Sequence, residues 1–203
     1  VWAKRDEVVR GVVMAKNLKQ ACDESLATTP TAAARPAAAM ICGDCAYLAG
    51  EPGDYAVLVE LLKPLRDAGV PVHMAMGNHD QRENFWKAFS PADGAKSLVD
   101  QRQVAVVPSP RANWFVLDSL DVTNKTPGVC GEKQLGWLAQ TLDARADKPA
   151  IVMVHHNPDE REQPTGLVDT AALYAVLEAR KHVKALFFGH THNWSVTERK
   201  GLH

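Results

Sequence analysis

Five polar residues that can bind metal ions follow short apolar segments: Asp44, Asn78, His155, His190 and His192. Carboxylate, amide oxygen and imidazole together suit divalent or trivalent ions such as Mn, Fe and Zn. A carboxylate such as Asp44 can bridge two ions about 3.5 to 4 Å apart, and such a pair can clamp both oxygens of an in-line phosphoryl displacement. These residue types therefore indicate a metal centre suited to phosphoester chemistry.

Strands that alternate with helices must position these residues. Apolar runs predict strands at residues 37–42, 70–76, 104–107, 114–117, 150–154 and 185–188. Two of them, 104–107 and 114–117, are candidates for an antiparallel pair. Helical periodicity predicts helices at residues 5–26, 55–68, 82–89, 132–144 and 169–180, the last with Asp169 as N-cap. Alternation of this kind indicates an α/β fold with a largely parallel sheet. Ligands bind beyond the carboxyl ends of such strands, so the polar residues are expected to meet at one edge.

Glycine precedes three of the clusters, at Gly43, Gly77 and Gly189. Because glycine has no Cβ, it lets a backbone turn sharply or approach a ligand closely. We therefore expect these three positions to shape the turns that carry the candidate ligands.

Composition narrows the class of protein. The chain has 203 residues, of which 46% are hydrophobic and 23% are charged, which fits a single globular domain over residues 1–203. The net charge of −1 gives no basic field to attract a nucleic-acid polymer. No apolar run reaches the roughly 20 residues that a membrane span needs. Four irregularly spaced cysteines fit reduced thiols and a cytoplasmic location, and Cys42 is expected to be a buried strand end instead of half of a zinc or redox pair.

The motifs together resemble those of calcineurin-like metallophosphoesterases. The order is Gly43-Asp44, then Gly77-Asn78-His79-Asp80, then a His after a strand, then Gly189-His190-Thr191-His192. Asn-His-Asp combined with Gly-His-x-His is a specific signature, whereas either motif alone is weak. The resemblance covers nearly the whole chain, and it implies a four-layer α/β/β/α sandwich.

The same resemblance implies a role for each site residue. Asp44 would bridge two ions, Asn78, His155 and His190 would complete the second site, and His192 would contribute to the first. His79 would face the substrate and stabilise the phosphoryl charge or protonate the leaving oxygen. Asp80 would orient His79, and a metal-bound hydroxide would be the nucleophile.

One element of the family pattern is missing from the sequence. The pattern begins with Asp-x-His at the end of a first strand, and we expect that motif just before Val1. Residues 195–199 and onward look like a strand, and further terminal strands are expected after His203, so the sandwich would be truncated at both ends. The resemblance then implies two ions (Mn, Fe or Zn) in the full-length protein and as few as one in this fragment.

Several neighbouring residues leave alternatives open. His155 is preferred to His156 as ligand because it is the first His after its strand. Arg82 is either a phosphate contact or a solvated residue at a helix start, and Trp194 either stacks on a substrate base or packs under its loop. Asp118 is expected to be structural.

The substrate expected from the resemblance is a small phosphodiester. The run that begins at Asp80 is similar to the branch of class III cyclic-nucleotide phosphodiesterases, so a cyclic nucleotide or a glycerophosphodiester leads. A phosphomonoesterase acting on proteins or nucleotides, or a non-catalytic metal-binding scaffold, is the alternative. A scaffold needs no substrate-side acid, so the presence of His79 with Asp80 favours an enzyme. The pattern predicts no oligomeric state.

Overall fold

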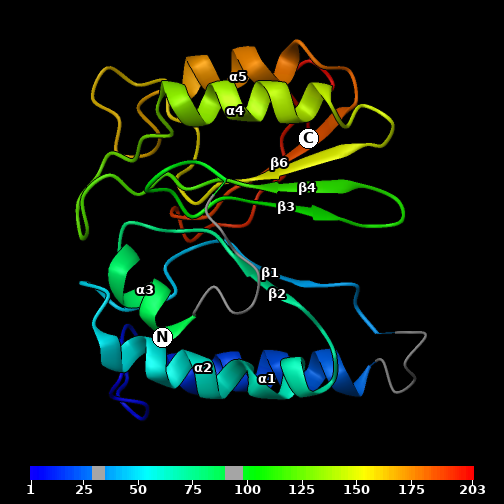
Figure 1. The fold of residues 1–203 in the computed structure, drawn as a ribbon. Coiled ribbons are helices and arrows are strands. Elements are labelled where there is room, and N and C mark those ends of the chain that lie inside the picture. The colour runs from blue at the N-terminus through cyan, green and yellow to red at the C-terminus, as the bar shows by residue number, and fades with distance from the viewer. Residues whose placement is uncertain (29–34, 90–97) are drawn as a thin grey trace.

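The computed structural model describes residues 1–28, 35–89 and 98–203 and shows four layers. One outer layer holds helices α1 (Met14–Ala27) and α2 (Pro52–Asp67), and the other holds α4 (Glu132–Asp143) and α5 (Thr170–Glu178). Two sheets lie between them, as Figure 1 shows. The predicted α/β/β/α arrangement is therefore confirmed.

The sheets differ in size and direction. The smaller sheet pairs β1 (Ala39–Ile41) with β2 (Val72–Met74) in parallel. The larger has the order β3-β4-β5-β6, with strands β3 (Ala105–Pro108), β4 (Asn113–Val116), β5 (Ala150–Met153) and β6 (Val183–Phe187). The pair β3–β4 is antiparallel, as expected, whereas β4, β5 and β6 are parallel. The parallel strands of each sheet therefore end at a common edge of that sheet.

Three apolar layers hold the sandwich together. One cluster packs α1, α2 and Phe85 of α3 (Arg82–Ala88) against the smaller sheet, and another packs α4 and α5 against the larger sheet. A third cluster lies between the sheets and includes Met40, Ala75, Val116 and Met153. Side chains alternate along each strand, so neighbours such as Phe115 and Val116 face opposite layers.

The first helix begins later than the sequence predicts, at Met14 instead of residue 5. Residues 9–12 form a tight turn closed by two hydrogen bonds between Val9 and Val12, of 2.8 and 3.0 Å. The two central residues, Arg10 and Gly11, both have positive φ angles. This backbone conformation is incompatible with a helix, so the apolar periodicity of Val8, Val9 and Val12 was misleading.

Two further local predictions need correction. Asp169 does occupy the N-cap position of α5, but its side chain makes no capping bond and instead accepts from the N–H groups of Cys130 and Gly131. The strand-like stretch near residues 195–199 forms no strand, although His203 pairs with the backbone of Lys184 and Leu186 beside β6. In the described ranges no helix is long and apolar enough to cross a bilayer.

Candidate metal centre

Four of the predicted ligands meet where the two sheets come together. Asp44 and Asn78 follow β1 and β2, whereas His155 and His190 follow β5 and β6. The Nε2 atom of His155 lies 3.3 Å from Asp44 Oδ1 and 3.3 Å from Asn78 Oδ1. The Nδ1 atom of His190 lies 3.0 Å from the same Asn78 oxygen. Each sheet therefore contributes half of the cluster.

These separations fit a shared cation. Donor atoms that bind one ion at about 2.1 Å and at right angles lie about 3 Å from each other. Within the described segments no group of three or more His, Cys, Asp or Glu side chains makes a metal site by itself. The candidate site therefore needs the amide oxygen of Asn78, which both imidazoles approach.

Backbone groups support both imidazoles. His155 Nδ1 lies 2.7 Å from the carbonyl oxygen of Cys42, and the backbone of Thr165 interacts with His190. A carbonyl accepts only, so in His155 the proton sits on Nδ1 and Nε2 keeps its lone pair. This is the support that metal-binding histidines usually have.

Burial keeps both rings in the form that binds metals. His155 is 3% exposed, and burial lowers its pKa more than the nearby charge of Asp44 raises it. Burial likewise lowers the pKa of His190, against the opposing effect of Asp44. A metal ligand must give up its proton, so a lowered pKa favours binding at neutral pH.

The backbone at the centre is unusual. Eight non-glycine residues of the described chain have positive φ angles, and three of them are the predicted ligands Asp44 (51°), His190 (69°) and His192 (55°). Asp and His tolerate this region better than most residues, but it still carries strain. Strain of this kind concentrates at functional sites, where the surrounding structure enforces it.

Two of the three glycines have the close approach expected of them. Gly43 has φ 85°, and a Cβ there would lie 2.6 Å from His155 Nδ1. A Cβ on Gly77 would collide with Asp44 Oδ1. Gly189 has neither a positive φ nor a contact tighter than 3.4 Å, so its turn does not demand glycine.

The fifth predicted ligand, His192, lies at the margin of the cluster. It is exposed, and its link with the other residues is electrostatic, since its charge lowers the pKa of His190. The structure brings it close to His190 but places it in no hydrogen bond with Asp44 among the described contacts.

His79 lies beside the cluster and is tied to it by its backbone. Its main-chain N–H donates to Asp44 Oδ1 at 3.1 Å, and its ring Nδ1 lies 3.0 Å from the carbonyl oxygen of Leu48. Its charge also lowers the pKa of His190. With Nδ1 donating to a carbonyl, Nε2 is the nitrogen left for a substrate.

Asp80 does not support His79, contrary to the sequence-based expectation. Its buried carboxylate accepts from the N–H groups of Gly77 (2.9 Å), Cys45 (3.2 Å) and Ala46 (3.0 Å) and from the hydroxyl of Tyr55 (3.1 Å). The three N–H groups lie in the two loops that carry Asp44 and Asn78. Asp80 therefore links the two loops that carry Asp44 and Asn78. The carbonyl of Leu48, and not Asp80, contacts the His79 ring and can orient it.

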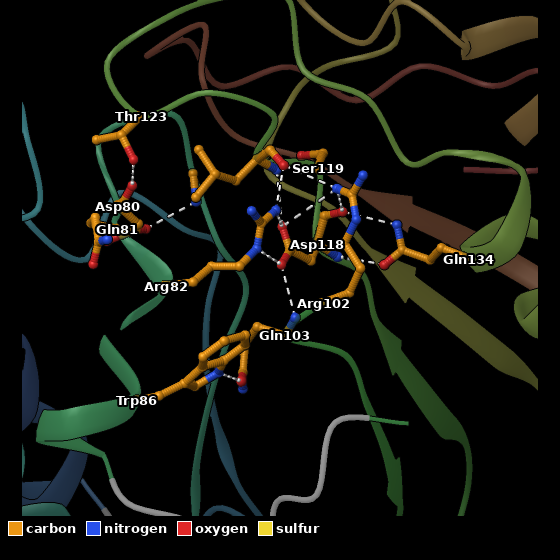
Figure 2. A network of polar contacts seen from close by, with 12 residues as sticks. Asp80, Gln81, Arg82, Trp86, Arg102, Gln103, Asp118, Ser119, Thr123 and Gln134 are labelled. Atoms are coloured by element: carbon orange, nitrogen blue, oxygen red, sulfur yellow. Dashed lines mark hydrogen bonds and ion pairs between the residues drawn. The ribbon is translucent and has the colours of Figure 1, made fainter. Parts of the chain in front are cut away.

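Neither alternative for Arg82 is correct, because it forms an ion pair inside the protein. Figure 2 shows its guanidinium against Asp118, with Nε 2.7 Å from Oδ2 and Nη2 2.9 Å from Oδ1. Asp118 is fully buried and also accepts from the N–H groups of Gln103 and Leu120. The expectation that Asp118 is structural is confirmed.

His156 is a buried neighbour of the cluster. Its Nδ1 lies 2.7 Å from Ser119 Oγ, and burial together with the two adjacent imidazoles lowers its pKa to about 3. Ser119 was missed in the sequence, since a lone serine after a strand has no distinguishing pattern. The backbone groups of Cys42 and Thr165 were missed for a stronger reason, because every residue has them.

Trp194 does not pack under its loop, as its side chain is 88% exposed. Cys42 directly follows β1 but is only partly buried, not fully buried as expected. Its thiol donates to the carbonyl of Val154, and burial raises its pKa to about 12. Cys45 is fully buried, which raises the pKa of its thiol as well. Neither thiol therefore has the ionised form that redox or zinc chemistry uses.

Comparison with known proteins places these motifs in a family. The family model described as calcineurin-like phosphoesterase matches residues 17–194. A cAMP/cGMP dual specificity phosphodiesterase of Mycobacterium tuberculosis is 34% identical over 163 residues, which cover 78% of this chain and 49% of that protein. The cyclic AMP phosphodiesterase CpdA of Pseudomonas aeruginosa is 28% identical over 149 residues, covering 70% of this chain and 50% of that protein.

Two further relatives extend the comparison. The glycerophosphodiester phosphodiesterase GpdQ of Enterobacter lignolyticus is 26% identical over 168 residues, covering 81% of this chain and 59% of that protein. The chain thus spans about half the length of the curated relatives it matches. The crystal structure of TT1561 from Thermus thermophilus aligns with a TM-score of 0.53 at 12% identity, over 85% of this chain and 75% of that one. At that identity the likeness supports the fold alone.

Proposed function

Because this chain belongs to the calcineurin-like phosphoesterase family, we propose that it forms the metal centre of a hydrolase that cleaves small phosphodiesters. The observation that carries the proposal is the convergence of two imidazole nitrogens on the Asn78 amide oxygen, with the Asp44 carboxylate beside the His155 nitrogen. The other nitrogen of His155 is fixed by the carbonyl of Cys42, and His190 is supported by the backbone of Thr165. A bound divalent ion would polarise the phosphoryl group and activate water at this position.

The residues around the ion would divide the work. Asp44, Asn78, His155 and His190 would hold one ion, and Asp44 together with His192 would serve a second ion in the whole protein. Manganese, iron and zinc all suit this mixture of oxygen and nitrogen donors. His79, beside Asp44, offers Nε2 to the phosphoryl oxygens or to the leaving oxygen, and its Nδ1 is held by Leu48.

The class of substrate follows from the relatives. Two of the compared proteins are named cyclic-nucleotide phosphodiesterases, and a third is named a glycerophosphodiester phosphodiesterase. All three names describe a small phosphodiester. The net charge of −1 also disfavours a long polyanion as substrate, because binding of such polymers depends on Lys and Arg.

The proposal is tested by hydrolysis of two aryl phosphates after chelation and addition of Mn²⁺. We expect bis(p-nitrophenyl) phosphate to be cleaved faster than p-nitrophenyl phosphate. Asn78→Ala is expected to lose both Mn²⁺ binding and turnover. His79→Ala should still bind Mn²⁺ but turn over about 10² to 10⁴ times more slowly, as expected for loss of a general acid. Asn17→Ala, an exposed change on α1, serves as the control.

Two results would contradict the proposed phosphodiesterase function. A faster reaction with the monoester would indicate a phosphomonoesterase. Mn²⁺ binding by the wild-type chain with no turnover of either ester, here and in the full-length protein, would indicate a metal-binding scaffold.

A further inference from the structure

His156 packs against both imidazoles of the candidate metal centre, although it is not among the four converging residues. Its ring centroid lies 5.1 Å from that of His155 at an interplanar angle of 88°, and 4.9 Å from that of His190 at 45°. The side chain is fully buried. The ring is therefore in a position to fix the orientation of both neighbours.

Two features fix the ring of His156 in turn. Ser119 Oγ accepts from the main-chain N–H of His156 at 3.3 Å and lies 2.7 Å from Nδ1 of the ring. Because this oxygen already accepts from the N–H, its own proton is available for Nδ1. In addition, a Cβ on Gly128 would collide with the ring, so the backbone packs directly against it.

Ser119, which anchors the ring of His156, is itself firmly held. Ser119 follows Asp118, whose main-chain N–H and carbonyl both bond with the Gln134 side chain and whose carboxylate is paired with Arg82. Figure 2 shows Ser119 at the edge of this network. A shift of the His156 ring would therefore require a shift of the buried end of β4.

The second nitrogen of the ring, Nε2, indicates that His156 has a role at this position. Nε2 of His156 is buried and has no hydrogen-bond partner among the described residues. An unpaired buried nitrogen destabilises a fold, and such atoms in native proteins call for an explanation. His156 Nε2 also lies within hydrogen-bond distance of neither Asp44 nor Asn78, whereas a ligand nitrogen would lie beside their oxygens. The ring is thus retained here without serving as a ligand.

We propose that His156 is a positioning residue whose ring, fixed by Ser119 and Gly128, holds the His155 and His190 imidazoles toward Asn78 Oδ1. This inference rests on the proposed function, because it concerns how the proposed ligands are held. The ring acts through its shape and packing, and neither of its nitrogens touches the ion or the substrate.

The test compares metal affinity in variants that separate the ring from its nitrogens. His156→Phe keeps an aromatic ring without nitrogen, His156→Asn keeps a polar atom near the Nδ1 position without the ring, and Ser119→Ala removes the anchor. Binding of Mn²⁺ is measured by titration calorimetry, and Co²⁺ binding by visible absorption, which reports the geometry of the ligands. His182→Asn is a matched control, since His182 also has a buried Nε2 without a partner among the described residues and lies directly before β6.

We expect His156→Asn to weaken Mn²⁺ binding about 10- to 100-fold, the usual effect of losing a group that supports a ligand. His156→Phe and Ser119→Ala both keep a ring at position 156 and both lose its bond to Ser119, so each should weaken Mn²⁺ binding by about 3-fold at most. The Co²⁺ spectrum should change in His156→Asn but not in His182→Asn.

Unchanged affinity and an unchanged Co²⁺ spectrum in His156→Asn would overturn the inference. A folded His156→Phe that loses as much affinity as His156→Asn would also overturn it, because a nitrogen and not the ring would then matter. Wild-type protein that binds neither Mn²⁺ nor Co²⁺ would instead contradict the proposed function, and this inference would fall with it.

Discussion

Arg82 donates two parallel hydrogen bonds to Asp118, and this ion pair connects the two halves of the candidate metal centre. Arg82 begins α3, four residues after Asn78, whereas Asp118 lies just beyond β4 of the larger sheet. The two sheets also meet through a small apolar cluster and through the hydrogen bonds of Cys42 with Val154 and His155. The pair therefore helps to set the distance between the candidate ligands that follow β1 and β2 and those that follow β5 and β6.

Arg82→Met should destabilise the protein by about 3 kcal/mol, because it leaves the buried Asp118 carboxylate without its charged partner. Denaturant unfolding measures this loss. Lys63→Met is the control, since the Lys63–Asp67 pair is exposed and removing it should cost less than about 0.5 kcal/mol. Equal effects of the two substitutions would show that the Arg82 pair has no special structural role.

Asp80→Asn should lower stability by about 1–3 kcal/mol, because the amide cannot accept all four hydrogen bonds and leaves a buried N–H unpaired. His79→Ala, one residue earlier, should leave stability nearly unchanged, since the main-chain N–H that contacts Asp44 remains. Thermal or urea unfolding of the two variants distinguishes the roles. If Asp80 acted only by orienting His79, its substitution would lower turnover without lowering stability.

Gly77→Ala should weaken metal binding at least about 10-fold, because the new methyl group would displace the Asp44 carboxylate. Gly136→Ala provides a matched control within α4, where a Cβ meets no atom within 4 Å. That control should raise stability by about 0.5–1 kcal/mol and leave Mn²⁺ affinity unchanged. Calorimetric titration with Mn²⁺ and urea unfolding give the two readouts.

Asp159 gives the protein a stability that depends on pH. A hydrogen bond from Arg161, with others from the N–H groups of Gly166 and Thr165, holds the pKa of this carboxyl well below its usual range. A carboxyl with a depressed folded-state pKa contributes stability above its unfolded pKa of about 3.9 and loses it as the pH falls toward the folded value. The loop it closes includes Thr165, which bonds to His190.

The urea midpoint of wild type should therefore exceed that of Asp159→Asn by a constant amount from about pH 7 to about pH 5. Below about pH 4 the difference should shrink. Arg161→Met should show a smaller pH dependence than wild type, because it removes the largest cause of the low pKa. A difference that grows as the pH falls would contradict this account.

The sequence was informative about the candidate centre because the predicted ligands follow strands. Asp44, Asn78, His155 and His190 all lie within four residues of a strand end, and the rule for parallel sheets brings such positions together. What could not be predicted depends on partners far away in the chain. Asp118 is 36 residues from Arg82, so no local pattern could show that this arginine is already paired.

Backbone conformation caused the other differences. Asp80 follows His79 directly, but the turn directs its carboxylate to amide groups of a different loop. The support for the imidazoles comes from main-chain groups, for which the sequence carries no signal. In the first predicted helix, Gly11 was the one sign of the tight turn that interrupts its expected beginning.

Addition of Mn²⁺ should raise the stability of the chain, because the native arrangement of Asp44, Asn78, His155 and His190 does not exist in the unfolded state. A ligand that binds only the folded state adds about 2.7 kcal/mol at a concentration about 100 times its dissociation constant. Thermal unfolding with and without Mn²⁺ measures this gain, and a chelator should reverse it. Asn78→Ala should show almost no gain, whereas Asn17→Ala on the distant surface of α1 should match wild type. An equal gain in wild type and Asn78→Ala would mean that Mn²⁺ binds elsewhere on the chain.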